Sequence, residues 1–158
     1  MMADSFSIRF ATMADAPIIT NHRRSMFQDM GERDTAKLNA MCASFDSWVV
    51  ERLKSGEYLG WLVENENKQI VAGAGMWLLP WAPTPSDQST HRGYVFNVYT
   101  QPDYRRRGLA RRLMNAILDY CRKQNIHVVS LHASDEGRGL YESLGFKPTN
   151  ELRLRLVE

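Results

Sequence analysis

A strand, a basic turn and a helix between residues 94 and 124 constrain this chain more than any other stretch. The segment Tyr94–Thr100 is rich in β-branched and aromatic residues, which is typical of a strand. From Leu109 to Cys121, apolar residues recur at three- and four-residue spacing, which is the pattern of an amphipathic helix. Pro102 lies between the two segments and ends the strand. The sequence therefore predicts a strand that passes through a tight turn into a helix.

The turn carries three consecutive arginines, Arg105–Arg107, followed by Gly108. A helix that starts directly after such a turn presents unpaired backbone N–H groups and the positive end of its dipole. Glycine also lets the backbone approach a ligand closely, because it has no Cβ. These features predict an anion site, and phosphate is the usual anion. The spacing matches neither G-x-x-x-x-G-K-[ST] nor G-x-G-x-x-G, which excludes a nucleoside-triphosphate loop and a dinucleotide fingerprint.

Two motifs resemble those of the GCN5-related N-acetyltransferases, the GNAT family. The spacing Arg105-x-x-Gly108-x-Ala110 is similar to the family signature [QR]-x-x-G-x-[GA]. The block at 140–146, Leu-Tyr-Glu-Ser-Leu-Gly-Phe, is similar to the second motif and lies at the expected distance downstream. The resemblance implies one N-acetyltransferase domain over residues 1–158. It also implies a mixed α/β fold, in which helices flank a twisted, mostly antiparallel sheet with two splayed strands.

The resemblance also assigns an acetyl-coenzyme A site. In the family, the splayed strands accept the pantetheine arm of the co-substrate through backbone hydrogen bonds. The signature turn binds the pyrophosphate through backbone N–H groups, and arginine side chains add charge-assisted contacts. By position, the residues expected around acetyl-coenzyme A are Val98, Tyr99, Thr100, Arg105, Arg106, Arg107, Gly108, Leu109, Ala110, Arg111 and Ser134.

Tyr141 matches the tyrosine that the family usually places beside the sulfur of coenzyme A. A phenol with an ordinary pKa of about 10 stays protonated at neutral pH and can donate to the departing thiolate. Packing of the short helix onto the sheet is the alternative role. The resemblance implies direct attack of an amine on a thioester carbonyl polarised by a backbone N–H of the central strand. Neither Cys42 nor Cys121 lies in an activated setting that would indicate a covalent intermediate.

Two positions depart from the family pattern. Ser134 stands where many relatives have asparagine, and its hydroxyl can still donate one hydrogen bond to the pantetheine arm. Asn97 stands where histone-type members have a glutamate that acts as general base, and an amide cannot accept that proton. A water chain, another side chain or an amine that arrives neutral would replace the base. The sequence does not rank the side-chain candidates, which are Asp29, Glu32, Asp87 and His91.

The acetyl acceptor is expected opposite the co-substrate, between the first helices and the proline-rich segment 79–92. The candidate acceptor-binding residues are Phe27, Met30, Trp81 and Asn97. Methionine and aromatic clusters are equally common in protein cores, so Phe27 and Trp81 also suit a packing role. We expect a small-molecule amine or amino-acid derivative, in preference to a peptide or protein amine, because no protein-specific feature stands out.

Charge and composition bear on the rival interpretations. The net charge of +2 and the pI of 8.6 are too mild for a chain that binds nucleic acid by counterion release. A nucleic-acid-binding domain built on the arginine turn and a non-catalytic acyl-coenzyme A sensor nevertheless stay open, the latter because of Asn97. The histidines lack metal-ligand spacing, and the longest apolar run is too short to span a bilayer. The absence of a signal-like start and the two distant cysteines favour a cytoplasmic protein.

Local patterns predict the remaining elements. Strands are expected at residues 7–10, 58–64, 69–79, 126–133 and 152–156, and helices at residues 12–31, 34–56 and 140–144. Segment 79–92 contains three prolines and is expected to be irregular. The last strand alternates leucine with arginine. By analogy with other folds, it is a candidate to pair across the two-fold axis of a homodimer.

Overall fold

The computed structural model describes residues 5–157 of the chain, and its strands form one sheet in the order β1-β2-β3-β4-β5. Neighbouring strands from β1 to β4 are antiparallel, whereas β5 runs parallel to β4. The strands are β1 Ser7–Phe10, β2 Tyr58–Glu64, β3 Ile70–Pro80, β4 His91–Thr100 and β5 Val129–Leu131. The helices are α1 Ala16–Asp29, α2 Thr35–Ser55, α3 Leu109–Lys123 and α4 Arg138–Ser143, with 3-10 turns at Met13–Asp15 and Pro102–Tyr104.

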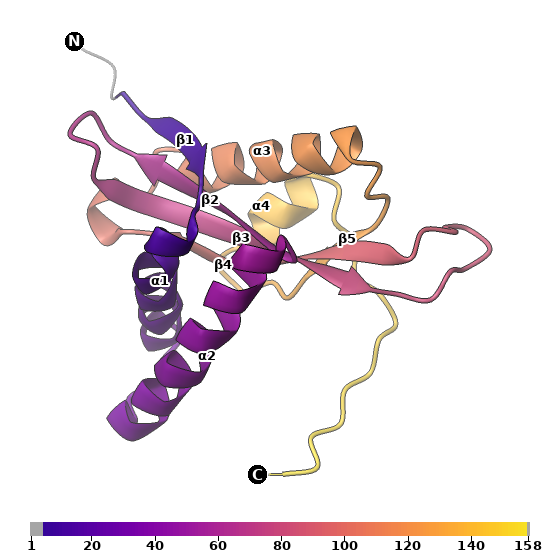
Figure 1. Cartoon of the computed structure of the whole chain (residues 1–158), viewed down its shortest axis with the longest axis horizontal. Helices are drawn as coiled ribbons and strands as arrows, with labels where there is room; N and C mark the ends of the chain where they lie inside the picture. Colours follow the sequence, from indigo (N-terminus) through magenta and orange to yellow (C-terminus); the bar gives the residue numbers. More distant parts are fainter. Residues whose placement is uncertain (1–4, 158) are drawn as a thin grey trace.

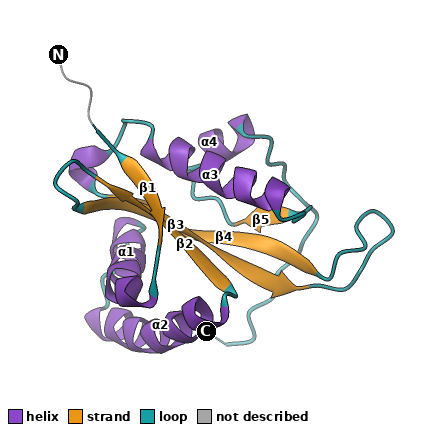
Figure 2. Cartoon of the chain, turned by 45° about the horizontal axis from the view of Figure 1, so that its top comes forward, coloured by secondary structure: helices purple, strands orange, loops and turns teal. Residues whose placement is uncertain are grey.

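Helices cover both faces of the sheet. The first two, α1 and α2, lie on one face, and α3 and α4 lie on the other (Figures 1 and 2). The β3–β4 hairpin projects beyond the helices at one end of the sheet (Figure 1). The predicted mixed α/β fold class is confirmed.

The predicted apolar stripe of α3 forms the core on its face of the sheet. Leu113 and Ile117 are fully buried and pack in one cluster with Val71 and Val95. Each such side chain contributes about 1.5–3 kcal/mol by leaving water. Because α3 follows β4 through a short turn, this packing holds the N-terminus of the helix beside the carboxyl end of β4.

Aromatic side chains dominate the other face, beneath α1 and α2. Trp48 of α2 makes edge-to-face contacts with Tyr58, Trp77 and Phe96, at ring-centroid distances of 5.1–6.2 Å. The carboxylate of Asp34 caps α2 by accepting a hydrogen bond from the backbone N–H of Lys37 at 3.1 Å. Asp34 therefore fixes the start of α2, and the contacts of Trp48 pack this helix onto the aromatic layer.

A β-bulge interrupts β4 at the centre of the sheet. Phe96 lies opposite Gly75 and Tyr99 lies opposite Gly73, so three steps along β4 match two along β3. Asn97 absorbs the extra residue in a left-handed conformation, with φ of 57°. Pairing with β5 ends at Val95 opposite Leu131, so β4 and β5 part at the bulge. This is the splayed pair of strands that the family resemblance implied.

Two of the expected boundaries are wrong. Segment 79–92 is regular at both ends, because β3 continues to Pro80, which lies opposite His91. Proline is tolerated there as the last residue of a strand, where few ladder bonds remain to be made. The strand expected at 126–133 is reduced to Val129–Leu131, because the bulge in β4 removes its partner beyond that point.

The strand predicted at 152–156 is also wrong. These residues have no ladder partner within the described part of the chain, and they run away from the sheet (Figure 1). Leu152, Leu154 and Leu156 are 94%, 80% and 87% exposed. Alternation predicts that a segment can form a strand, but a strand also needs an edge to pair with, and this segment reaches none in its own sheet.

Candidate active site

The gap between β4 and β5 leaves one edge of β4 open. From Phe96 to Thr100, β4 pairs with β3 on one side and has no strand partner on the other within residues 5–157. The backbone groups of Val98, Tyr99 and Thr100 lie in this open stretch. The geometry therefore suits the predicted addition of a pantetheine arm by backbone hydrogen bonds, although these three contacts stay a prediction.

The basic turn lies at the end of this open edge. Arg106 and Gly108 both adopt left-handed conformations, with φ of 63° and 75°, and Gly108 is the N-cap of α3. A Cβ added at Gly108 would meet no protein atom within 4 Å. The turn thus leaves free space before the first N–H groups of α3, which is where a phosphate binds. The residues of the turn fit the pyrophosphate of acetyl-coenzyme A.

The arginines of the turn differ in their present partners. Arg105 donates to the carbonyl of Thr100 at 2.9 Å and to the carboxylate of Asp29 at 2.7 Å, so it fastens the turn to β4 and α1. Arg106 is exposed. The guanidinium of Arg107 lies 5.3 Å from the ring centre of Tyr104, which belongs to the same turn. Arg105 therefore has a structural role that the sequence did not indicate.

The start of α3 combines packing with binding surface. The Leu109 side chain is 2% exposed and belongs to the core, so only its backbone N–H can face a ligand. Ala110 is half-buried and Arg111 is exposed. Arg111 donates to the hydroxyl of Ser143 at 2.9 Å, which ties α3 to α4. The predicted cofactor roles of these three residues stay predictions.

Tyr141 projects from α4 into the core beneath α3. Its side chain is 9% exposed and packs edge-to-face against Phe146, with ring centres 6.0 Å apart. Burial raises the pKa of its phenol above the ordinary value of 10. Its hydroxyl makes no hydrogen bond to a described residue, so it remains free to donate to a ligand. Tyr141 thus serves the packing role and suits the predicted proton donor as well.

Ser134 lies just before α4 and accepts hydrogen bonds from the residues at its start. Its hydroxyl accepts a hydrogen bond from the backbone N–H of Gly137 at 3.1 Å, and its carbonyl accepts one from the N–H of Arg138 at 3.0 Å. The hydroxyl proton is not used in these bonds. Ser134 is exposed, so this proton can still serve the pantetheine contact that the sequence predicted.

Asn97 is held between the half-buried Arg23 and the buried Tyr58 on the α1 face. Its side-chain oxygen accepts a hydrogen bond from Nη1 of Arg23 at 2.8 Å, and its Nδ2 donates to the hydroxyl of Tyr58 at 3.2 Å. Burial raises the pKa of Tyr58 to about 12, so this phenol stays protonated. Asn97 is itself 3% exposed. Neither Asn97 nor its partners therefore offers a general base at neutral pH.

Sequence reasoning missed Arg23 and Tyr58. Arg23 lies one helical turn before Phe27, and its guanidinium is 5.0 Å from the ring centre of Phe27. That spacing was the one available signal. Tyr58 carried no signal, because its contact with Asn97 joins residues 39 apart in the sequence.

The other acceptor candidates are not gathered in one place. Phe27 lies beside Arg23, whereas Met30 follows α1 and is 55% exposed. Trp81 belongs to the β3–β4 hairpin and lies under the guanidinium of Arg92, 3.9 Å from the ring centre. The structure thus brings Phe27 and Asn97 together through Arg23, and it places Trp81 and Met30 on separate segments.

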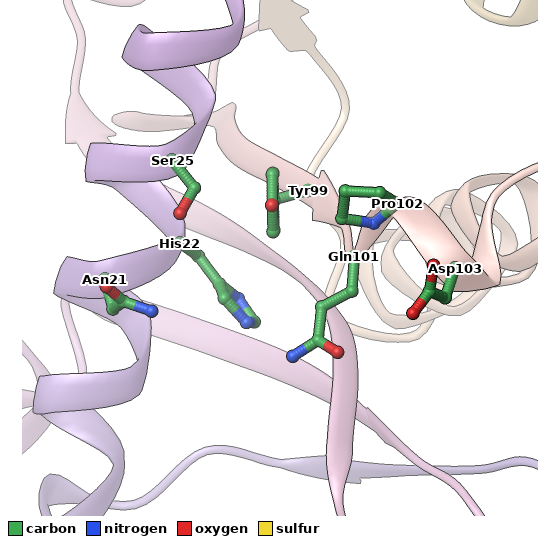
Figure 3. A pocket seen from close by; sticks show the side chains of 7 residues that line it. All are labelled: Asn21, His22, Ser25, Tyr99, Gln101, Pro102 and Asp103. Atoms are coloured by element: carbon green, nitrogen blue, oxygen red, sulfur yellow. The ribbon is translucent and has the colours of Figure 1, made fainter.

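A polar hollow of about 340 Å³ lies between α1 and the carboxyl end of β4 (Figure 3). Asn21, His22 and Ser25 of α1 face Tyr99 and Gln101 across it (Figure 3). His22 is buried, and its ring lies 5.2 Å from that of Tyr99. Burial lowers the pKa of His22 to about 4, so it is neutral at physiological pH. None of the motif residues at 105–110 or 140–146 lines this hollow, so the β4–β5 gap remains the better candidate for acyl transfer.

No helix within residues 5–157 is long and apolar enough to cross a membrane. The same part of the chain contains no group of three or more histidine, cysteine, aspartate or glutamate side chains placed to bind a metal ion.

A splayed sheet with the open N-terminus of α3 at the end of the gap is the architecture expected of an acyl-coenzyme A-dependent transferase. The sequence matches the family model "Acetyltransferase (GNAT) family" over residues 19–146. The chain therefore belongs to the GNAT family, as its motifs predicted, and it is an acetyl-coenzyme A-dependent N-acetyltransferase. Acetyl-coenzyme A is its co-substrate, and an amine is its acceptor.

Solved structures agree with this assignment. A GCN5-related N-acetyltransferase from Ralstonia eutropha JMP134 is 34% identical, with a TM-score of 0.90 over 96% of this chain and 99% of that one. A predicted acetyltransferase from Clostridium acetobutylicum, with acetyl-CoA in its crystal structure, is 28% identical, with a TM-score of 0.88 over 96% and 97%. Glucosamine-6-phosphate N-acetyltransferase from Arabidopsis thaliana shares the fold, at 16% identity and a TM-score of 0.70 over 98% and 99%. No curated protein matches the sequence.

Proposed function

We propose that this enzyme transfers the acetyl group to the primary amine of a small molecule or amino-acid derivative, by direct attack in a ternary complex. The observation that carries the proposal is the open edge of β4 from Phe96 to Thr100, which leads to the turn with open space beside Gly108. The protonated phenol of Tyr141, whose side chain packs in the same cluster as Val98, adds a proton donor. Together they can bind a thioester, orient it and supply a proton to its leaving group.

The residues of the chain divide the chemistry between them. Bound acetyl-coenzyme A supplies the activated thioester. The open backbone of Val98 to Thr100 would align the thioester and polarise its carbonyl through an N–H group. Tyr141 would donate its phenolic proton to the thiolate sulfur as the carbon–sulfur bond breaks, because its raised pKa keeps that proton in place. Ser134 would hold the pantetheine arm with its unused hydroxyl proton.

The proton of the acceptor has no side-chain base beside Asn97. Both hydrogen-bonding atoms of Asn97 are occupied, and its partners are a guanidinium and a protonated phenol. We propose that the acceptor amine reacts in its neutral form and that water removes the proton released on attack. Of the earlier candidates, Asp29 is engaged by Arg105 and Asp87 by His127, which makes both unsuited to the role.

Two alternatives to this function remain, and each is supported by a feature of the chain. A peptide or protein N-terminus is an amine as well, and Met30 and Trp81, which are both exposed, leave large apolar side chains available to a larger acceptor. A sensor that binds acyl-coenzyme A without catalysis is suggested by the amide at Asn97. The buried and unbonded phenol of Tyr141 favours an enzyme over a sensor.

Titration with acetyl-coenzyme A, followed by a thiol-release assay over small amines, amino-acid derivatives and peptides, tests the proposal. Thiol release with small amines is expected. Release with peptides alone would favour the peptide alternative, and tight binding without release from any amine would favour the sensor. Absence of acetyl-coenzyme A binding would contradict the proposal as a whole.

We also propose a cytoplasmic homodimer, in which the leucine side of segment 152–156 is covered by a second copy. Three exposed leucines on one side of an extended segment support this proposal. The outer edge of β5, unpaired in the described sheet, supports it too.

A further inference from the structure

Buried hydrogen-bond donors without partners gather on the acceptor side of the sheet. Four buried side-chain nitrogen atoms lack a partner within residues 5–157: Arg23 Nε, Arg52 Nε, Trp77 Nε1 and Arg92 Nε. All four are N–H donors, and none is an acceptor. Leaving a buried donor unpaired costs about 1–3 kcal/mol. A ligand that brings oxygen acceptors would offset this cost.

Contacts between rings connect three of these donors. The guanidinium of Arg52 lies 4.3 Å from the ring centre of Trp48, which touches Trp77 at 5.1 Å and Phe96 at 6.0 Å. The guanidinium of Arg23 lies 5.5 Å from the ring centre of the same Phe96. The donors therefore border one aromatic layer under α1 and α2, next to the bulge in β4.

Arg23 is a cation in this layer without an acidic partner. None of the ion pairs in the described part of the chain includes it, and the ionisable groups near it are Tyr58, Tyr94 and Cys42. Arginine stays charged at neutral pH even though burial lowers the pKa of Arg23. Phe27 and Phe45, each 5.0 Å away, stabilise the guanidinium by cation–π contact but supply no negative charge.

One edge of the Arg23 guanidinium is free. Nη1 donates to Asn97, and it is the only nitrogen of Arg23 with a hydrogen bond to a described residue. Nε and Nη2 form the other edge, whose two parallel N–H groups match the two oxygens of a carboxylate. Nη1 bonds to Asn97, which occupies the bulge where β5 leaves β4, so the Arg23 guanidinium lies next to the start of the β4–β5 gap.

We infer that the acceptor carries a carboxylate beside its amine, and that the Nε–Nη2 edge of Arg23 binds it. The inference rests on the proposed function and narrows the acceptor to an amino acid or a similar zwitterion. A phosphate monoester presents the same oxyanion chemistry, and the test below separates the two. The fixed positive charge also disfavours an ammonium group nearby, which favours the neutral amine that the reaction needs.

The test compares each amino acid with its own carboxamide in the thiol-release assay, and phosphoethanolamine with ethanolamine. We expect the wild type to use carboxylated amines. Arg23→Gln should lower kcat/KM for the amino acid by about 10- to 100-fold, mainly through KM, and change that for the carboxamide by less than about threefold. Comparing variant with wild type for each acceptor cancels the different reactivities of the two amines. Arg23→Lys should recover part of the loss.

Arg24→Gln is the matched control. Arg24 is the next residue of α1 and also donates to an amide oxygen, that of Asn39 at 2.9 Å, but it lies away from the bulge in β4. The Arg24→Gln variant should keep the wild-type ratio of kcat/KM for the amino acid to kcat/KM for its carboxamide. Equal losses for both acceptors in Arg23→Gln would overturn the inference, since Arg23 would then act only by positioning Asn97. Preference for the phosphorylated amine over all carboxylates would overturn the carboxylate assignment.

A measurement on the wild type covers the case in which Arg23→Gln does not fold. An N-acetylated amino acid should inhibit the enzyme at least about tenfold more tightly than its N-acetylated carboxamide. Equal inhibition would overturn the inference. Turnover of neutral amines alone would overturn it while leaving the proposed function standing, whereas no turnover of any amine would remove the proposed function itself.

Discussion

Residue 97 is an asparagine, whose amide replaces a potential general base. Its hydrogen bonds give it a structural role, because they join Arg23 to Tyr58. Arg23 and Tyr58 use both ends of the Asn97 side chain, and Asn97 and Tyr58 are buried. Glutamate at this position would pair directly with Arg23 and cancel its charge. The amide leaves that charge available to a ligand, so loss of the base and gain of an anion site are two consequences of one residue.

Tyr141→Phe removes the proton donor and keeps the ring. The packing against Phe146 should persist, because the contact uses the ring edge and not the hydroxyl. We expect kcat to fall on the order of a hundredfold, with acetyl-coenzyme A affinity nearly unchanged. Steady-state kinetics and calorimetric titration measure the two quantities. Tyr120→Phe is the control, since Tyr120 is half-buried and its ring, like that of Tyr141, packs edge-to-face against another aromatic ring, that of Trp61. Unchanged turnover in Tyr141→Phe would leave Tyr141 with a packing role alone.

His22 makes the stability of the protein depend on pH. Its folded-state pKa of about 4 lies below the ordinary value of 6.5 because burial disfavours the charged ring. The neutral ring is therefore favoured in the fold, and this contribution is complete above pH 6.5 and is lost as pH falls from 6.5 toward 4. Between pH 7 and pH 5, the free energy of unfolding should decrease by about 2 kcal/mol on account of this group.

Urea unfolding of His22→Gln at the two pH values measures this effect. The variant should lose less stability than the wild type between pH 7 and pH 5, by about that same 2 kcal/mol. His91→Gln, at an exposed histidine, should keep the wild-type dependence. Equal losses in all three proteins would show that His22 is not the group responsible.

At the scale of elements, the bulge in β4 creates the site. The extra residue at Asn97 turns the end of β4 away from β5, and the pairing of the two strands stops at Val95. The same divergence opens the β4 edge toward one ligand and brings Asn97 to the α1 face, where the other ligand would lie. One bulge thus produces both the open edge of β4 for the co-substrate and the position of Asn97 on the side where the acceptor is proposed to bind.

Gly108→Ala tests the turn between β4 and α3. A Cβ in the left-handed conformation should cost about 1 kcal/mol of stability and should occupy the space before the first N–H groups of α3. We expect acetyl-coenzyme A affinity to fall by at least about tenfold. Gly56→Ala is the matched control, because Gly56 also has a left-handed conformation, with φ of 83°, and open space around it. It should lose similar stability and bind acetyl-coenzyme A normally. Equal affinities in the two variants would contradict the predicted phosphate site.

The sequence predicted the elements whose causes are local and missed those that depend on a distant partner. The apolar stripe from Leu109 to Cys121 and the helix expected from residue 34 to residue 56 each depend on residues within that helix, and both helices are present. The length of β5 depended on the bulge in another strand, and the strand at 152–156 depended on an edge that the single chain does not offer. The motifs located the co-substrate turn, but Arg23 and Asn97 lie 74 residues apart, and no local pattern joins them.

For the whole molecule, the two faces of the sheet have different tasks. The face under α3 and α4 carries the aliphatic core and Tyr141. The face under α1 and α2 carries the aromatic layer with its unpaired donors. The gap between β4 and β5 is where the two faces meet. On the proposed function, a thioester along the open edge of β4 would be reached by an amine from the α1 face, without passage through the core.

The segment at 147–157 gives the molecule a surface that a single copy does not cover. In this segment, the side chain of Arg153 contacts one ring nitrogen of His132. The other ring nitrogen of His132 contacts the hydroxyl of Tyr94. On the proposed homodimer, the leucine side of this segment is buried against the second copy. The segment would then lie close to Tyr94, near the proposed acceptor site.

Leu154→Asp tests this arrangement. A carboxylate in the middle of the leucine side would have to be buried without a partner, so we expect the dimer to dissociate or weaken by at least about a hundredfold. Sedimentation and light scattering over a range of protein concentrations measure the assembly. Arg155→Asp is the control, because it places the same charge on the opposite side of the alternating segment and should leave the dimer in place. A wild type that stays monomeric at every concentration would contradict the proposal, and so would equal weakening by both substitutions, which would indicate net charge as the cause.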